Sequence, residues 1–163
     1  MTASGRSGHL DGGRRVLAEF SLPSEPGNER RVAGEVAAAV ESLGLSEQRM
    51  ERLKTAVAEA TMNAMEHGNE YRAEVPVVVE VLASGQELLI RITDLGGSPV
   101  PVPDPEVPDL SAKLEGLQTP RGWGLFLIRN MVDEMNITGD RDHHTVELIM
   151  HLDEAPKGGE DAG

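Results

Sequence analysis

The stretch EATMNAMEHGN, residues 59–69, decides how this chain folds and what it can bind. Read as a helix, it places Glu59, Asn63 and His67 four residues apart and therefore on one face. The positions between them are mainly alanine and methionine, which suits a helix packed against a core. A carboxylate and a carboxamide on such a face need polar partners, because burying them unpaired is costly.

Hydrated Mg²⁺ with phosphate oxygens is one partner that fits this pair of side chains, since Mg²⁺ takes oxygen ligands and keeps several waters. The Asn63 carbonyl would ligate the metal, and Glu59 would orient or deprotonate a nucleophile beside it. A partly exposed helix with a solvated polar stripe is the alternative for this segment taken alone.

A second segment, LLIRITDLGGSP at residues 88–99, predicts a strand that runs into Asp94 and then ends sharply. An aspartate at the end of a buried strand can accept a hydrogen bond from an exocyclic amine such as that of adenine. Gly96 would let the backbone approach a flat ring, because glycine has no side chain in the way. An ordinary strand-to-turn junction uses the same residue types.

A third segment, TPRGWGLFLIRNMVD at residues 119–133, predicts an apolar helix opened by Gly122 and Gly124. Free backbone N–H groups and the positive end of a helix favour an anion there. Arg121 adds a forked donor suited to phosphate. A glycine-containing loop before a core helix is the alternative, but three such segments in this order favour a nucleotide site.

These segments resemble the N box, the first glycine box and the second glycine box of the GHKL ATPase superfamily, which uses the Bergerat ATP-binding fold. The form Glu-Ala-x-x-Asn-Ala-x-x-His-Gly most resembles the N box of the RsbW/SpoIIAB-type anti-sigma-factor serine kinases. The resemblance covers roughly residues 16 to 152 and implies ATP and Mg²⁺ as cofactors. It further implies a serine/threonine kinase that phosphorylates a STAS-type anti-anti-sigma protein and sequesters a sigma factor, and it allows a homodimer.

The resemblance also implies a role for each matching residue. Asn63 would ligate Mg²⁺ between the phosphates, and Glu59 would be the general base for the incoming hydroxyl. Asp94 would read the adenine amine, with Gly96 lining the base pocket. The other implied nucleotide-binding residues support the N box or belong to the lid and phosphate cradle: His67, Arg121, Gly122, Gly124 and Leu125.

One departure from the family pattern concerns Ser98, which stands where many relatives carry a second glycine of the first glycine box. We therefore expect nucleotide affinity or lid motion to differ from the family norm. Residues 101–108 contain four prolines among acidic residues, which predicts an extended lid tract. Residues 110–117 could then form a short helix before the second glycine box.

Composition predicts a single cytoplasmic domain. The 163 residues suffice for one sizeable core, and there is no cysteine for disulfides or thiolate metal sites. No apolar stretch approaches the ~20 residues that span a bilayer, and the chain starts without a secretory signal. The net charge of −13 argues against direct nucleic-acid binding and suits either a basic protein partner or solubility alone.

Local patterns predict an α+β two-layer sandwich, with a mainly antiparallel mixed sheet covered on one face by helices. We expect a disordered segment at residues 1–14, an ATP-binding domain at 15–153 and a flexible acidic tail at 154–163. Ser46 should cap the N-box helix and Gly44 should close the helix before it. The predicted strands are 16–22, 75–83, 87–94, 134–138 and 145–152, and the first helix runs from residue 26 or 28 to 43.

Three functional hypotheses remain open from the sequence. The leading one is an ATP-dependent protein kinase that also sequesters a sigma factor. The second is a nucleotide-dependent binding switch without kinase activity, which mutation of Glu59 would distinguish from the first. The third is an interaction module with no ATP affinity, in which Asp94→Asn would have no effect.

Overall fold

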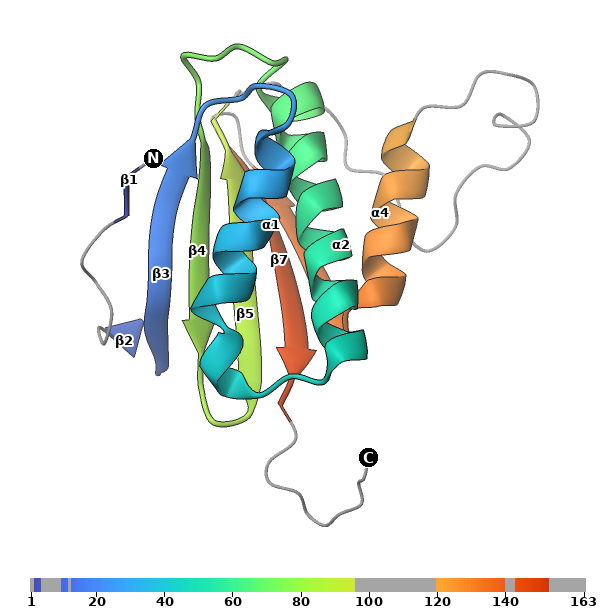
Figure 1. Ribbon diagram of the computed structural model, residues 1–163. Coiled ribbons are helices and arrows are strands. Elements are labelled where there is room, and N and C mark those ends of the chain that lie inside the picture. Colours follow the sequence, from blue (N-terminus) through green and yellow to red (C-terminus); the bar gives the residue numbers. More distant parts are fainter. Residues whose placement is uncertain (1, 4–9, 12, 96–119, 140–142, 153–163) are drawn as a thin grey trace.

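The computed structural model describes residues 2–3, 10–11, 13–95, 120–139 and 143–152, and within them a sheet and a layer of helices pack face to face (Figure 1). The strands lie in the order β1-β3-β4-β5-β7-β6, with β2 also paired to β3, and all of these pairs are antiparallel. The strands are β1 Thr2–Ala3, β2 Leu10–Asp11, β3 Arg14–Leu22, β4 Val77–Ala83, β5 Glu87–Asp94, β6 Glu134–Gly139 and β7 His144–His151. The helices are α1 Asn28–Ala39, η1 Glu41–Leu43, α2 Glu47–Asn63, η2 Ala64–Gly68 and α4 Pro120–Met131.

This arrangement confirms the predicted two-layer sandwich and its helix-covered face. The predicted strands 75–83 and 87–94 pair with each other as β4 and β5, and 134–138 and 145–152 pair as β6 and β7, each close to its expected bounds. The sheet is antiparallel throughout the described strands rather than mixed. None of the described helices has the length and apolarity that crossing a bilayer requires.

Capping residues set the helix ends as the sequence indicated. The Ser46 side chain accepts a hydrogen bond from the Arg49 backbone N–H at 3.1 Å, which satisfies one of the free donors in the first turn of α2. Gly44 has φ +74 and ends η1, a conformation that glycine adopts without strain. The helix predicted to reach residue 43 is broken at Val40, where α1 gives way to the 3₁₀ turn η1.

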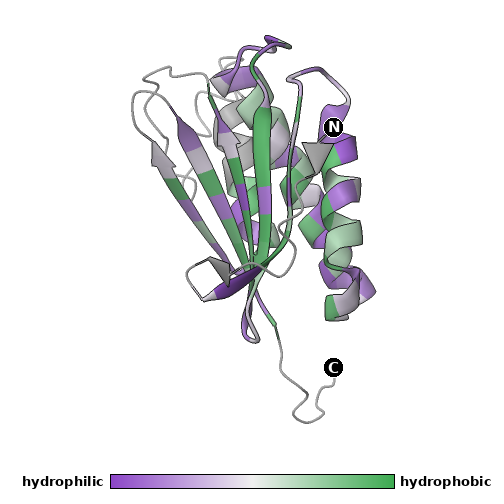
Figure 2. Cartoon of the chain, turned by 90° about the vertical axis from the view of Figure 1, so that its left-hand side faces the viewer, coloured by the Kyte–Doolittle hydropathy of each residue, from purple (hydrophilic) through white to green (hydrophobic). Residues whose placement is uncertain are grey.

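The larger core cluster lies between the helices and one face of the sheet, and a small cluster of Val16, Leu82, Leu89 and Ile149 is buried on the other face. Hydrophobic and hydrophilic bands alternate along the strands, as a half-covered sheet requires (Figure 2). On the other face, Arg91 pairs with Glu147 at 2.9 Å and with Glu80 at 3.7 Å. The fully buried core side chains include Val32, Leu53, Met65, Ile90, Ile128 and Leu148.

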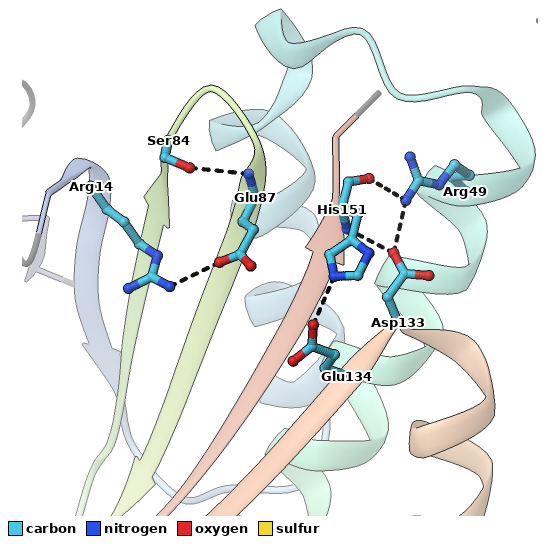
Figure 3. A network of polar contacts seen from close by, with 7 residues as sticks. All are labelled: Arg14, Arg49, Ser84, Glu87, Asp133, Glu134 and His151. Atoms are coloured by element: carbon cyan, nitrogen blue, oxygen red, sulfur yellow. Dashed lines mark hydrogen bonds and ion pairs between the residues drawn. The ribbon is translucent and has the colours of Figure 1, made fainter. Parts of the chain in front are cut away.

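A polar network fixes the start of α2 to the edge of the sheet (Figure 3). Arg49 Nη2 donates to Asp133 Oδ2 at 3.1 Å and to the His151 carbonyl at 2.6 Å. The same Asp133 oxygen accepts the His151 backbone N–H at 2.7 Å. Glu134 accepts a hydrogen bond from His151 Nε2 at 2.7 Å, which raises the pKa of this imidazole. These contacts therefore connect the first turn of α2 to the start of β6 and the end of β7.

The N-terminal segment differs in part from the expected disorder at residues 1–14. Thr2–Ala3 and Leu10–Asp11 form short strands that pair with β3, and β3 itself begins at Arg14. The physical reason is that β3 is otherwise an edge strand, whose unpaired N–H and C=O groups attract another strand. The domain boundaries at residues 15, 153 and 154 stay predictions.

Candidate nucleotide site

The helix that carries the N box changes its winding inside the motif. Glu59 and Asn63 lie on α2, whereas His67 lies in the π-helical turn η2. A π turn takes more residues than an α turn, so the shared face predicted for all three residues applies to Glu59 and Asn63 and is altered at His67. Single π turns of this kind are frequent at functional sites.

The Asn63 carboxamide has an unmet hydrogen-bonding requirement. Its Nδ2 is buried and has no hydrogen-bond partner among the described residues, and the same holds for Oγ1 of the fully buried Thr61. Leaving a buried polar group unsatisfied costs about 1–3 kcal/mol, so a partner from outside the chain would be favoured. A phosphate oxygen suits the amide N–H, and Mg²⁺ suits the amide oxygen, so the donor set fits a Mg²⁺–phosphate group.

Glu59 sits in an environment that resists its negative charge. Partial burial raises the pKa of its carboxyl group, and the neighbouring carboxylates of Glu29 and Glu66 raise it further. A raised pKa brings a carboxylate closer to the range in which a general base works well. The same acidic surroundings favour a cation beside this residue.

Asp94 ends β5 as a buried carboxylate, with only 5% of its surface exposed. Gly68 of η2 packs directly on this carboxyl group and leaves no room for a Cβ atom. On the sheet side, His144 Nδ1 lies 3.2 Å from Asp94 Oδ1. The end of the N-box segment and the end of β5 therefore meet at one carboxylate, as the prediction of a single site requires.

Asn69 joins these segments and was not singled out from the sequence. It is fully buried, and its Oδ1 accepts the Leu95 backbone N–H at 2.9 Å. Its Nδ2 donates to Ser24 Oγ at 3.0 Å and to the carbonyls of Pro76 at 3.1 Å and Val75 at 3.3 Å. The only signal available beforehand was its position directly after the His-Gly pair.

His144 was also missed as a site residue. The sequence places it beside His143 in a turn or at the start of a strand, and nothing local connects it to Asp94, fifty positions earlier. The two residues are direct cross-strand partners in the β5–β7 register. A correct pairing of the strands would have been needed to find it.

The phosphate end of the predicted site is described only in part. Arg121, Gly122, Gly124 and Leu125 lie in the first half of α4, which packs against α2. The glycines thus stand inside the helix that they were expected to open. Gly96, Ser98 and the predicted lid at residues 101–117 lie outside the described residues.

A second group of metal-ligating side chains lies at the opposite end of β5 and β7 (Figure 3). Ligand atoms of Glu87, Glu134 and His151 lie within 4.8 Å of one another. Glu87 already pairs with Arg14 at 2.9 Å, and Glu134 with His151 at 2.7 Å. Both carboxylates therefore already have partners within the chain, and we keep Asn63 as the candidate metal ligand.

Comparisons with known proteins agree with this geometry. Residues 22–150 match the histidine kinase-like ATPase domain family. The chain is 33% identical over 135 residues to an anti-sigma F factor of Anoxybacillus flavithermus, covering 82% of this chain and 90% of that protein. It is 28% identical over the same coverage to anti-sigma F factors of Bacillus thuringiensis and Bacillus cereus.

A solved structure supports the fold. The RsbU and RsbW domains of a Mycobacterium tuberculosis protein match with a TM-score of 0.55 at 17% identity, over 82% of this chain. The matched part is 32% of that longer chain, so this chain spans about a third of it.

Proposed function

Because this chain belongs to the histidine kinase-like ATPase family, of the GHKL type with RsbW/SpoIIAB-like character, we propose that it is an ATP-binding anti-sigma factor with protein serine/threonine kinase activity. Its substrate would be a STAS-type anti-anti-sigma protein, and its other partner a sigma factor. The names of the relatives support the sigma-factor partner, since this chain covers 90% of the first of them. We place the protein in the cytoplasm on the same grounds.

The meeting of η2 with the end of β5 is the observation that carries the proposal. Gly68 packs on the Asp94 carboxyl group, and Asn69 binds the Leu95 N–H. These contacts hold the Asp94 carboxyl group, which would read the base, next to the C-terminal end of the segment that carries Glu59 and Asn63. A binding site for a nucleotide needs both: an acceptor for the base, and oxygen and nitrogen groups for the metal and phosphates.

Glu59 would act on the substrate hydroxyl. The oxygen of the substrate hydroxyl forms a bond to the γ-phosphorus of ATP, and the bond from that phosphorus to the oxygen that bridges it to ADP breaks. Glu59 accepts the proton that the hydroxyl loses. The raised pKa of Glu59 suits this proton transfer. Bound Mg²⁺ would supply charge neutralisation on the phosphates, with Asn63 as its protein ligand.

The positive charge and backbone donors for the phosphates would come from the first half of α4. We assign this role to Arg121, Gly122, Gly124 and Leu125, with Gly96 lining the base pocket and His67 supporting the N box. Arg30 and Arg31 on α1 are our candidates for partner contacts. The net charge of −13 favours encounter with a basic partner surface.

Calorimetric titration with ATP and Mg²⁺ tests the nucleotide site. The wild type should bind saturably, Asp94→Asn should lose binding, and Asn63→Ala should bind in a manner that no longer depends on Mg²⁺. Absence of binding by the wild type at millimolar ATP would refute the proposal and favour a module that uses no nucleotide.

Phosphoryl transfer needs a separate assay. The wild type and Glu59→Gln are incubated with γ-labelled ATP and a purified STAS-domain protein from the same organism. Label on a serine or threonine of that protein, lost in Glu59→Gln while ATP binding persists, is the expected result. Binding without transfer by the wild type across the organism's STAS proteins would instead identify a nucleotide-dependent switch.

A further inference from the structure

We propose that His144 is a positioning residue that makes Asp94 select a 6-amino purine over a 6-oxo purine. The inference rests on the proposed nucleotide site and adds to it the source of base specificity. It starts from a contact between a buried carboxyl group and a half-buried imidazole: His144 Nδ1 lies 3.2 Å from Asp94 Oδ1, and the two side chains are 17% and 7% exposed.

Backbone pairing holds the two side chains on the same face of the sheet. Asp94 and His144 are cross-strand partners at the ends of β5 and β7. Their neighbours Thr93 and Thr145 are also partners and bond to each other at 3.0 Å, but they point to the opposite face. His144 is therefore the β7 side chain placed beside the Asp94 carboxyl group.

Two glycines set the space around this pair. A Cβ atom on Gly139, the β6 partner of His144, would lie 2.6 Å from His144 Cδ2, so the imidazole ring lies over Gly139. On the other side, Gly68 packs against the Asp94 carboxyl near Oδ2. The ring and the carboxylate are both confined, and neither glycine covers them with a side chain.

The chemistry of selection follows from which atom donates. A proton on His144 Nδ1 donates to Asp94 Oδ1 and fixes the rotation of the carboxyl group about its last bond. The second carboxyl oxygen, Oδ2, is thereby held in one place and can accept further hydrogen bonds, since a carboxylate oxygen has two lone pairs. An exocyclic amine can donate to this oxygen, whereas the carbonyl of guanine or hypoxanthine would place two acceptors face to face.

Without His144 the carboxyl group can rotate about its last bond, so its oxygens are no longer held in one place. It would then accept from the amine of ATP less well, whereas a 6-oxo analogue, which makes no such hydrogen bond, would lose little. The loss should appear as weaker ATP binding together with a smaller preference over a 6-oxo analogue, and this ratio separates positioning from a general loss of stability.

The test compares Mg²⁺-ATP with Mg²⁺-ITP, which carries oxygen in place of the 6-amino group, by calorimetric titration of the full chain. We expect the wild type to prefer ATP, and we expect His144→Ala to reduce both ATP affinity and the ATP-to-ITP ratio by about tenfold, as for loss of a hydrogen bond to a charged group. His144→Asn should restore most of the ratio, because its amide N–H can donate close to the place of Nδ1. His151→Ala, a matched change at the other end of β7, should leave both affinities unchanged.

Gly139→Ala gives a second variant with the imidazole still present. The new Cβ must displace the ring, so the ratio should fall as in His144→Ala. A wild type that binds neither nucleotide would overturn the proposed function itself. A wild type that selects ATP, with the same ratio in folded His144→Ala or Gly139→Ala, would overturn this inference and leave the proposed function standing.

Discussion

Replacement of Asn69 by alanine should destabilise the domain more than any other single loss of a polar side chain near the site. This residue is fully buried and connects the β3–α1 turn, the segment before β4 and the end of β5. Each of these connections is a hydrogen bond, and those to Ser24 and Leu95 join segments that are far apart in sequence. Their removal loosens the frame that holds Asp94.

The expected loss in the free energy of unfolding can be estimated from the polar groups that lose Asn69 as a hydrogen-bond partner. The Val75 carbonyl keeps the Ser24 hydroxyl at 2.6 Å, so it is not orphaned. The Leu95 N–H and the Pro76 carbonyl both lose the Asn69 side chain as a partner. A buried orphan costs about 1–3 kcal/mol, and since Leu95 is 36% exposed and Pro76 is half-buried, water can reach both. With the small cavity added, we expect a loss of about 2–3 kcal/mol in the free energy of unfolding.

Urea unfolding followed by circular dichroism measures this quantity, and Tm should fall by roughly 5–10 °C for a domain of this size. Asn136→Ala is the matched control, since Asn136 is an exposed asparagine on β6. The control should change stability by less than about 0.5 kcal/mol. If the two variants lose the same small amount, the reasoning from buried hydrogen bonds is refuted.

Three further changes test other parts of the molecule. Gly68→Ala would place a Cβ atom against the Asp94 carboxyl group, so the affinity for ATP measured by calorimetry should fall at least tenfold, which corresponds to about 1.4 kcal/mol. A Gly68→Ala variant that binds ATP as tightly as the wild type would contradict the argument from packing. Glu59→Gln should raise Tm near pH 7.5, because the pKa of this carboxyl group is raised in the folded state and the folded protein therefore loses stability as the group ionises. The gain in Tm should vanish as the pH falls below the ordinary pKa of 4.5, and an equal gain at pH 7.5 and below pH 4.5 would contradict this explanation. Ser46→Ala should cost about 1 kcal/mol in urea unfolding through loss of the cap on Arg49, and Ser46→Asp should recover most of it; no loss in the alanine variant would show that the cap is energetically silent.

Local signals in the sequence predicted most of the fold. The Ser46 cap, the Gly44 stop and the apolar, β-branched run of β5 each depend on residues within a few positions of one another. The break at Val40 and the π turn η2 were missed, because small changes in winding are decided by packing rather than by local propensity.

The site residues also differ in whether local sequence signals could predict them. Glu59, Asn63 and Asp94 could be proposed from motifs, since each follows from its own segment. His144 and Asn69 could not, because their importance lies in contacts across the sheet and between loops. A single sequence does not state which strands pair, so residues that support a site from another strand stay hidden until the register is known.

Polar groups near the site fall into two sets: those with hydrogen-bond partners in the chain and those without partners among the described residues. The two sets match the two proposed roles, base binding and phosphate binding. At the base end, Asn69 and Ser24 are buried with partners from the chain, and Asp94 has His144, so this end is shaped before any ligand arrives. On α2, buried polar atoms of Asn63 and Thr61 lack partners among the described residues, and Glu59 has a raised pKa. Polar groups without partners destabilise the folded state. A ligand that forms hydrogen bonds to them stabilises the folded state, because it binds the folded state and not the unfolded one. The end of the site that we propose reads the base is therefore held by partners from the chain, whereas the helix that we propose acts on the phosphates keeps polar groups that a bound nucleotide could satisfy.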